Sequence, residues 1–92
     1  MEITYTCAYH PRVKDDIKHI GKSEKDRVKK AIKEKLTAHP EVFGAPLQRS
    51  LKGYRKLRVG DYRVVFKVRG TTVHILAIKH RSVVYEDTKK RV

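Results

Sequence analysis

The spacing of apolar residues divides the chain into two parts with different periods. In residues 11–38 apolar side chains recur at intervals of three and four, as on one face of an amphipathic helix. In residues 54–79 they alternate with polar side chains, as in β-strands. This change of period predicts an α+β domain in which two helices precede most of the strands.

A strand is predicted at the start of the chain. Residues 2–9 are rich in β-branched and aromatic side chains, which favour extended backbone. Because alternate side chains of a strand share a face, Ile3, Tyr5, Cys7 and Tyr9 are expected to lie together.

A short helix is predicted next. Val13, Ile17 and Ile20 are spaced by four and three residues and form one apolar stripe. Gly21 follows directly, at the position where a left-handed residue commonly ends a helix.

A second helix is predicted over residues 24–38, so the two helices form an antiparallel hairpin. Ser23 and Asp26 resemble a capping box at its start, although Glu or Gln is more usual at the second position. Residues 39–50 contain two prolines and a glycine and are interpreted as a connecting loop.

The second part of the chain predicts an antiparallel meander packed on the helix hairpin. The expected strands are residues 54–59, 62–68 and 72–79, joined by tight turns that contain glycine. Residues 83–91 are interpreted as a short C-terminal helix or a frayed basic tail. The predicted element order is therefore β-α-α-β-β-β with an optional final helix, in a single domain over residues 1–92.

The alternation within the meander predicts which side chains face the helices. The apolar positions of neighbouring strands share one face, which is expected to pack on the helix hairpin. The opposite face is expected to be open and to display four cations close together. This basic face contains Lys56, Arg58, Arg63 and Lys67.

The charge of the chain points to a polyanionic partner. Its 92 residues include 23 Lys and Arg against 10 Asp and Glu, a net charge of +13. Residues 47–92 carry thirteen basic and three acidic side chains, whereas residues 1–46 carry ten and seven. A functional surface is therefore expected in the second half, for nucleic acid or an acidic protein.

Composition also excludes several classes of protein. A single cysteine, Cys7, rules out an intramolecular disulfide framework and a thiolate zinc cluster. No apolar stretch approaches the roughly 20 residues of a membrane-spanning helix. The first residues lack the features of a signal peptide, so a cytoplasmic domain without a membrane partner is expected.

Three residues are candidates for proton transfer in RNA cleavage, where a base activates the 2′-hydroxyl and an acid protonates the departing 5′-oxygen. His74 has the strand parity of Leu76 and Ile78, which favours a core or edge position. For His80 a functional and a structural role are equally supported. From residue type alone, Tyr85 is better explained as a hydrophobic anchor.

Two runs of residues resemble the RelE/ParE superfamily of bacterial and archaeal toxins. Residues 51–66, with the run Arg-Val-Gly-Asp-Tyr-Arg, resemble the central strand hairpin of that superfamily. Residues 75–85 are similar to the end of its domain, with the ending Arg-x-x-x-Tyr. Length, element order and basic charge fit as well, so the resemblance covers essentially the whole chain.

The resemblance implies one of two activities. RelE-like members cleave messenger RNA in the ribosomal A site, and an antitoxin that wraps the toxin neutralises them. ParE-like members share the fold, act on DNA gyrase and lack the catalytic basic residues. Because this chain keeps those residues, the resemblance favours the RelE-like activity, without metal or cofactor. A gyrase inhibitor and an inactive module that binds nucleic acid or antitoxin remain alternatives.

The resemblance also assigns residues and partners. It implies a monomer when free and a hetero-oligomer with an acidic antitoxin, and it implies contact with messenger RNA and ribosomal RNA. Lys79 is an alternative to Arg81 in the second cationic role. The implied catalytic residues are Lys56, Arg58, Arg63, Arg81 and Tyr85, and the expected RNA contacts are Tyr54, Arg55, Lys67, Lys79 and His80.

Overall fold

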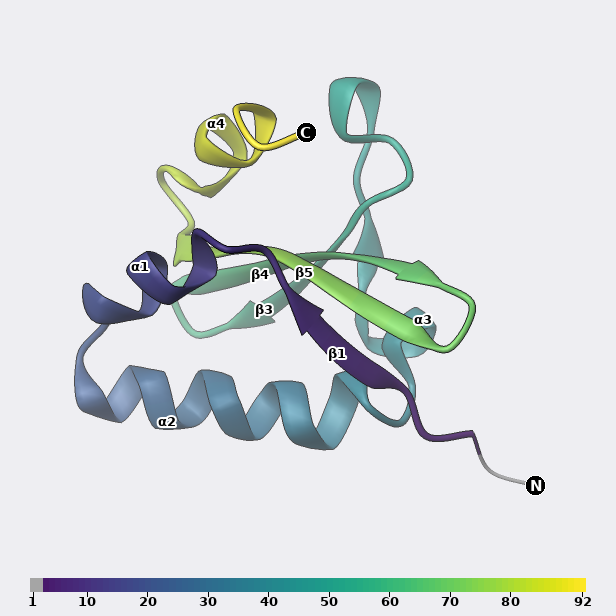
Figure 1. Cartoon of the computed structure of the whole chain (residues 1–92). Helices are drawn as coiled ribbons and strands as arrows, with labels where there is room; N and C mark the ends of the chain where they lie inside the picture. Colours follow the sequence, from purple (N-terminus) through teal and green to yellow (C-terminus); the bar gives the residue numbers. More distant parts are fainter. Residues whose placement is uncertain (1–2) are drawn as a thin grey trace.

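A computed structural model describes residues 3–92 and contains a five-stranded sheet in the order β1-β5-β4-β3-β2 (Figure 1). β1 pairs with β5 in parallel, and all other pairs are antiparallel. The predicted α+β class and strand meander are confirmed. The strands are β1 (Thr6–Tyr9), β2 (Ala45–Pro46), β3 (Arg55–Val59), β4 (Tyr62–Arg69) and β5 (Thr72–His80).

Helices lie on both faces of the sheet (Figure 1). The long helix α2 covers one face, and the predicted C-terminal helix is present on the other as α4. No helix in residues 3–92 is long and apolar enough to cross a membrane. The helical segments are α1 (Val13–Lys18), α2 (Lys22–Ala31) with a π-helical extension (Ile32–Leu36), α3 (Pro40–Phe43), a 3₁₀ turn (Arg49–Leu51) and α4 (Val84–Lys89).

The main core lies between the sheet and the helices α1 and α2. The predicted stripe of α1 is confirmed, since Val13 and Ile20 are buried and Ile17 packs against the core. Val64 and Phe66 of β4 face the same core and are fully buried, as the alternation of that strand predicts. Apolar burial on this face therefore orients β3 and β4 and fixes which of their side chains point away from it.

A smaller core lies between α4 and the opposite face of the sheet. Val65 of β4, Ala77 of β5 and Val84 of α4 are fully buried against one another. The prediction that this face is open is therefore wrong. Val65 lies between the cations Arg63 and Lys67 on this face of β4, and α4 packs on Val65.

A bulge in β5 changes which side chains share a face. The pairing of β5 with β4 shifts in the middle of the ladder, where Leu76 is an extra residue. His74 is therefore exposed, opposite Lys67, and does not share the face of Ile78, which is in the main core. The predicted parity of His74 is wrong because one inserted residue reverses the alternation beyond it.

The boundary between α1 and α2 also differs from the prediction. Gly21 has a φ of −58° and is the N-cap of α2, not a left-handed end of α1. Ser23 lies inside α2, and no side chain hydrogen-bonds to that helix start, so the predicted capping box is wrong. Both helices therefore meet at a tight corner around Gly21.

The first strand is shorter than predicted. β1 begins at Thr6, and Glu2 of the predicted strand lies outside the described residues. Tyr5 and Cys7 pack against the main core, but Ile3 and Tyr9 remain exposed. The predicted loop over residues 39–50 contains α3, β2 and the start of the 3₁₀ turn.

Candidate functional site

Lys56 and Tyr85 meet on the face of the sheet that α4 partly covers. Lys56 points to this face because its neighbour Leu57 is buried in the main core. Tyr85 follows Val84, whose burial fixes the first turn of α4 on the sheet. The Lys56 Nζ lies 5.8 Å from the centroid of the Tyr85 ring. Lys56 belongs to the run of residues 51–66 and Tyr85 to the run of residues 75–85, so the fold brings together one implied catalytic residue from each run.

A second pair of the same kind lies on this face. The Lys67 Nζ lies 5.4 Å from the centroid of the Tyr54 ring, which precedes β3. Each cation over an aromatic ring contributes about 0.5–1 kcal/mol when solvent-accessible. The two contacts hold both ammonium groups above aromatic rings at the surface, where an anion can reach them.

Arg63 is held more tightly than expected for a residue of an open face. Its side chain is buried, and its Nη1 donates hydrogen bonds of 2.9 Å to the carbonyl oxygens of Gly60 and Tyr62. Arg58 lies opposite it on β3 and is exposed. Arg58 lines a polar pocket of about 320 Å³ together with Arg27 of α2. Its guanidinium thus extends the basic surface around the edge of β3.

His80 is the last residue of β5 and is exposed. Its ring packs edge-on against Tyr62, and its Nδ1 accepts a hydrogen bond of 3.2 Å from the amide of Ser82. It lines a polar pocket with Arg27 and Asp61. Arg81 is exposed at the same end of β5.

The ammonium group of Lys79 forms ion pairs with two carboxylates. Its Nζ lies 2.9 Å from Oδ2 of Asp87 and 3.6 Å from Oδ1 of Asp16. The hydrogen bond from Lys79 lowers the pKa of Asp87 below its ordinary value. Arg81 carries no such pairing among the described residues, which favours it over Lys79 for the second cationic role.

Asp16 anchors the other end of α4 through a buried ion pair. The two nitrogens of Arg91, Nη1 and Nη2, each donate a 2.7 Å hydrogen bond to one of its oxygens. Burial opposes ionisation of Asp16, but hydrogen bonds from Arg91 and the Ile78 amide outweigh it and lower its pKa. Arg91 also donates to the carbonyl of Leu76, the bulged residue of β5.

The side chain of Arg55 is half-buried and hydrogen-bonds to the backbone of the protein. Its Nη1 donates to the carbonyl oxygen of Gly44 at 2.9 Å and to that of Glu41 at 3.4 Å. The guanidinium therefore ties β3 to α3. In the sequence, Arg55 alternates with Leu57 and Val59 on one face of the strand, and this position indicated a structural contact.

Two cations near Tyr85 were not predicted from the sequence. Arg49 of the 3₁₀ turn and Lys89 of α4 line one pocket with Lys56 and Tyr85. Lys89 lies four residues after Tyr85, so helical spacing alone places the two on one side of α4. Arg49 lies in a predicted loop, and nothing in its neighbours marked its position.

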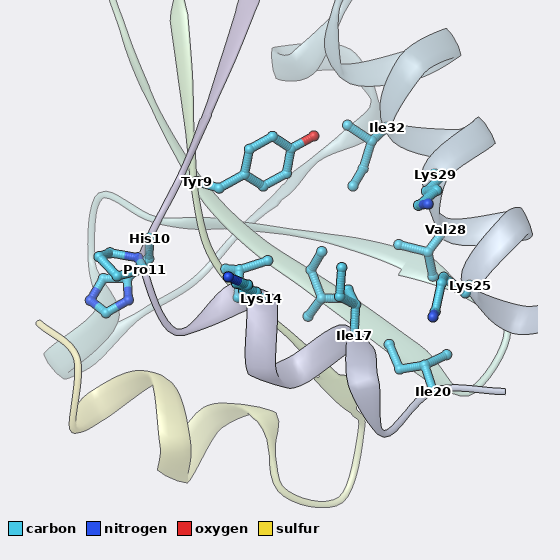
Figure 2. A pocket seen from close by; sticks show the side chains of 12 residues that line it. Tyr9, His10, Pro11, Lys14, Ile17, Ile20, Lys25, Val28, Lys29 and Ile32 are labelled. Carbon is cyan, nitrogen blue, oxygen red and sulfur yellow. The ribbon is translucent and has the colours of Figure 1, made fainter. Parts of the chain in front are cut away.

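A separate apolar groove lies on the other side of the molecule, between β1, α1 and α2 (Figure 2). Its volume is about 410 Å³, and its walls include Val13, Ile17, Ile20, Val28 and Ile32. Four of these five, Val13, Ile20, Val28 and Ile32, are buried in the main core, so the groove is a recess over that core.

A sequence model of the family described as "ParE toxin of type II toxin-antitoxin system, parDE" matches residues 8–85. The chain belongs to this toxin family. It is therefore a type II toxin of the RelE/ParE superfamily, and the resemblance expected from residues 51–66 and 75–85 is confirmed. No protein with a curated description matches the toxin in sequence.

Solved structures share the fold. A chain of the toxin–antitoxin complex RelBE2 from Mycobacterium tuberculosis is 28% identical over 87% of the toxin and 94% of that chain, with a TM-score of 0.80. A mutant of the E. coli toxin RelE in the free state has a TM-score of 0.66 at 20% identity, over 98% and 99% of the two chains. The RelB-RelE complex from Methanococcus jannaschii gives 0.65 at 22% identity, over 86% and 95%.

Proposed function

We propose that the toxin is an endoribonuclease that cleaves messenger RNA in the ribosomal A site and so inhibits translation. The observation that carries this proposal is the Lys56–Tyr85 contact on the basic face. It combines a fixed cation with a phenol that can give up or take a proton, beside further cations. A purely inhibitory binding surface has no need of this combination.

The proposed reaction is an internal transfer at phosphorus. The 2′-oxygen of the RNA loses its proton and attacks the adjacent phosphate, and a phosphorane with five oxygen ligands forms. The bond to the 5′-oxygen of the next nucleotide then breaks, and that oxygen takes up a proton. Tyr85 transfers protons in this step, and Lys56 stabilises the negative charge that builds on the phosphate oxygens.

Three arginines complete the proposed site. Arg63 and Arg81 stabilise the phosphorane, and Arg58 positions the RNA chain along the edge of β3. The hydrogen bonds that hold Arg63 against Gly60 and Tyr62 give it a fixed direction, which suits a group that must not reorganise during the reaction. Tyr54 and Lys67 are proposed to contact RNA beyond the cleaved bond.

The test is translation of a defined message in vitro with the purified toxin, followed by primer extension to map RNA ends. New ends within A-site codons, absent when the same RNA is offered without ribosomes, are expected. Translation that continues on uncut RNA would contradict the proposal.

A second candidate function is inhibition of DNA gyrase. The description of the matching family, which names ParE toxins, favours this candidate. It predicts loss of DNA supercoiling by purified gyrase when the toxin is added, with messages left uncut. Measuring supercoiling and RNA ends on the same toxin preparation separates the two functions.

We further propose that the apolar groove binds an acidic segment of the cognate antitoxin. Toxin–antitoxin complexes are among the solved structures that share the fold. Lys14, Lys25 and Lys29 line the groove together with its apolar walls (Figure 2). A peptide that alternates apolar and acidic side chains complements such a groove, with the charges accelerating its association.

Reversing the three groove lysines is expected to weaken the complex. The triple variant Lys14→Glu, Lys25→Glu, Lys29→Glu should lower the association rate with the cognate antitoxin by about tenfold or more, because the steering charges change sign. Surface plasmon resonance at two salt concentrations measures this. The control variant Lys33→Glu, Lys52→Glu, Lys90→Glu makes the same change of net charge elsewhere. Equal losses for both variants would mean that only net charge matters, not the groove.

A further inference from the structure

A pocket between the 3₁₀ turn and α4 adjoins the Lys56–Tyr85 contact. Its volume is about 320 Å³. Leu47, Leu51 and the ring of Tyr85 give it an apolar lining, and Leu51 is buried beneath it. In Figure 1 the turn and α4 stand on the same face of the sheet. The pocket therefore opens toward the surface on which the proposed reaction takes place.

The rim of the pocket carries hydrogen-bonding and cationic groups. Gln48, Arg49 and Ser50 come from the turn, and Lys89 comes from α4. Within residues 3–92, the side chains of Gln48, Arg49 and Ser50 make no hydrogen bond or ion pair. These groups are therefore available to a ligand.

The backbone of the turn is held in an unfavourable conformation. Arg49 has a φ of +58°, the left-handed region that a side chain with a Cβ rarely adopts. Among described residues other than glycine it is alone in this. Hydrogen bonds from the Leu51 amide to the Gln48 carbonyl and from the Lys52 amide to the Arg49 carbonyl maintain the turn. Strain of this kind persists where the surrounding structure enforces it, and it concentrates at ligand sites.

The chemistry of the pocket matches that of a nucleotide. A nucleobase has two apolar faces that stack on an aromatic ring, and an edge of donors and acceptors. An amide side chain such as that of Gln48 offers one donor group and one acceptor, so it can pair with such an edge. Lys56, Lys89 and Arg49 are placed to neutralise the phosphates on either side of the base.

We propose that this pocket binds a nucleobase of the messenger RNA beside the cleaved phosphate, and that Gln48 selects the base through its hydrogen-bonding edge. The inference rests on the proposed RNA-cleaving function and deepens it, since it locates the base preference of the toxin in the 3₁₀ turn. Tyr85 supplies the stacking surface, and Gln48 supplies the discrimination.

The pocket is tested first on the free toxin by NMR titration with the four nucleoside 5′-monophosphates and with ribose 5-phosphate, which lacks a base. The four nucleotides should shift the amide signals of residues 47–51 and 85–89, and ribose 5-phosphate, whose phosphate can still bind Arg49 and Lys89, should leave those of Leu47 and Gln48 in place. The variant Gln48→Ala should change the ratio of the tightest to the weakest dissociation constant by about fivefold, the worth of one hydrogen bond. Identical shifts with ribose 5-phosphate would overturn the proposal.

The second measurement maps cleavage sites on translating ribosomes. Gln48→Ala should redistribute the bases found at cleaved positions, and Lys52→Ala, a neighbouring exposed change outside the pocket, should not. An unchanged distribution in Gln48→Ala would overturn the role of that residue. If the wild-type toxin cuts no message, the proposed function fails, and the titration still decides whether the pocket binds a base. If the wild type cuts but the nucleotides shift no signals, only the pocket inference fails.

Discussion

Replacing Tyr85 with phenylalanine is expected to lower the rate of messenger-RNA cleavage on ribosomes by about 10²- to 10⁴-fold, the usual worth of one proton-transfer group. The substitution removes only the hydroxyl group. The ring remains below Lys56, where the Nζ lies 5.8 Å from its centroid, and it still lines the pocket beside α4. Single-turnover cleavage with toxin in excess over programmed ribosomes measures the chemical step.

The control for this prediction is Tyr5→Phe. Tyr5 also loses only a hydroxyl, but it packs against the main core on the far side of the sheet. Its cleavage rate should match that of the wild type. Near-normal cleavage by Tyr85→Phe would mean that the residue is an anchor for α4, the interpretation that its residue type alone favoured.

The variant Asp16→Asn is expected to destabilise the toxin by about 3–5 kcal/mol, which is typical when one member of a buried ion pair is removed. The side chains of Asp16 and Arg91 are only 1% and 6% exposed. Asparagine leaves the Arg91 charge buried without its partner. For a domain whose total stability is about 5–15 kcal/mol, this is a large fraction, and urea unfolding at neutral pH measures it.

The neighbouring residue Asp15 supplies the matched control. It pairs with Lys18 at 3.6 Å, but both side chains are more than 60% exposed. Asp15→Asn should therefore cost about 1 kcal/mol or less, because water screens the pair. Equal losses for the two variants would contradict the anchoring role of the Asp16–Arg91 pair.

The same ion pair makes the stability of the toxin sensitive to acid. Folding lowers the pKa of Asp16, so its contribution is present above the ordinary aspartate value of about 3.9 and is lost as the pH falls through the lowered pKa. Asparagine does not titrate. The stability difference between wild type and Asp16→Asn is therefore expected to shrink below about pH 4.

The strand pattern predicted much of the candidate site. Alternation in β3 and β4 placed Lys56 on the face opposite α1 and α2, and the burial of Leu57 and Val64 in the core on the other side shows why that prediction succeeded. Apolar side chains at every second position leave only one register that buries them. A buried sheet face thus fixes the direction of the polar side chains between its apolar ones.

Other features of the site depend on contacts that no local pattern encodes. The bulge at Leu76 reversed the predicted face of His74. The carbonyl of Leu76 accepts a hydrogen bond from Arg91, which is 15 positions away in the chain. The pair of Asp16 and Arg91 spans 75 positions. Nothing in the sequence singled out Asp16 within its short helix, and Arg91 lay in the segment interpreted as a short C-terminal helix or a frayed basic tail. Only the packing of α4 on the sheet brings such residues together.

The parallel pairing of β1 with β5 has a consequence for synthesis of the toxin. β1 is made before its partner residues, Thr72 to Ile75, which follow 66 positions later in the chain. The long-range ion pair that anchors α4 forms later still, once residue 91 has been added. Contacts between distant parts of a chain are slow to form because a long loop must close first. Until α4 is anchored in this way, Tyr85 is not held in place beside Lys56, so the growing chain lacks the proposed site.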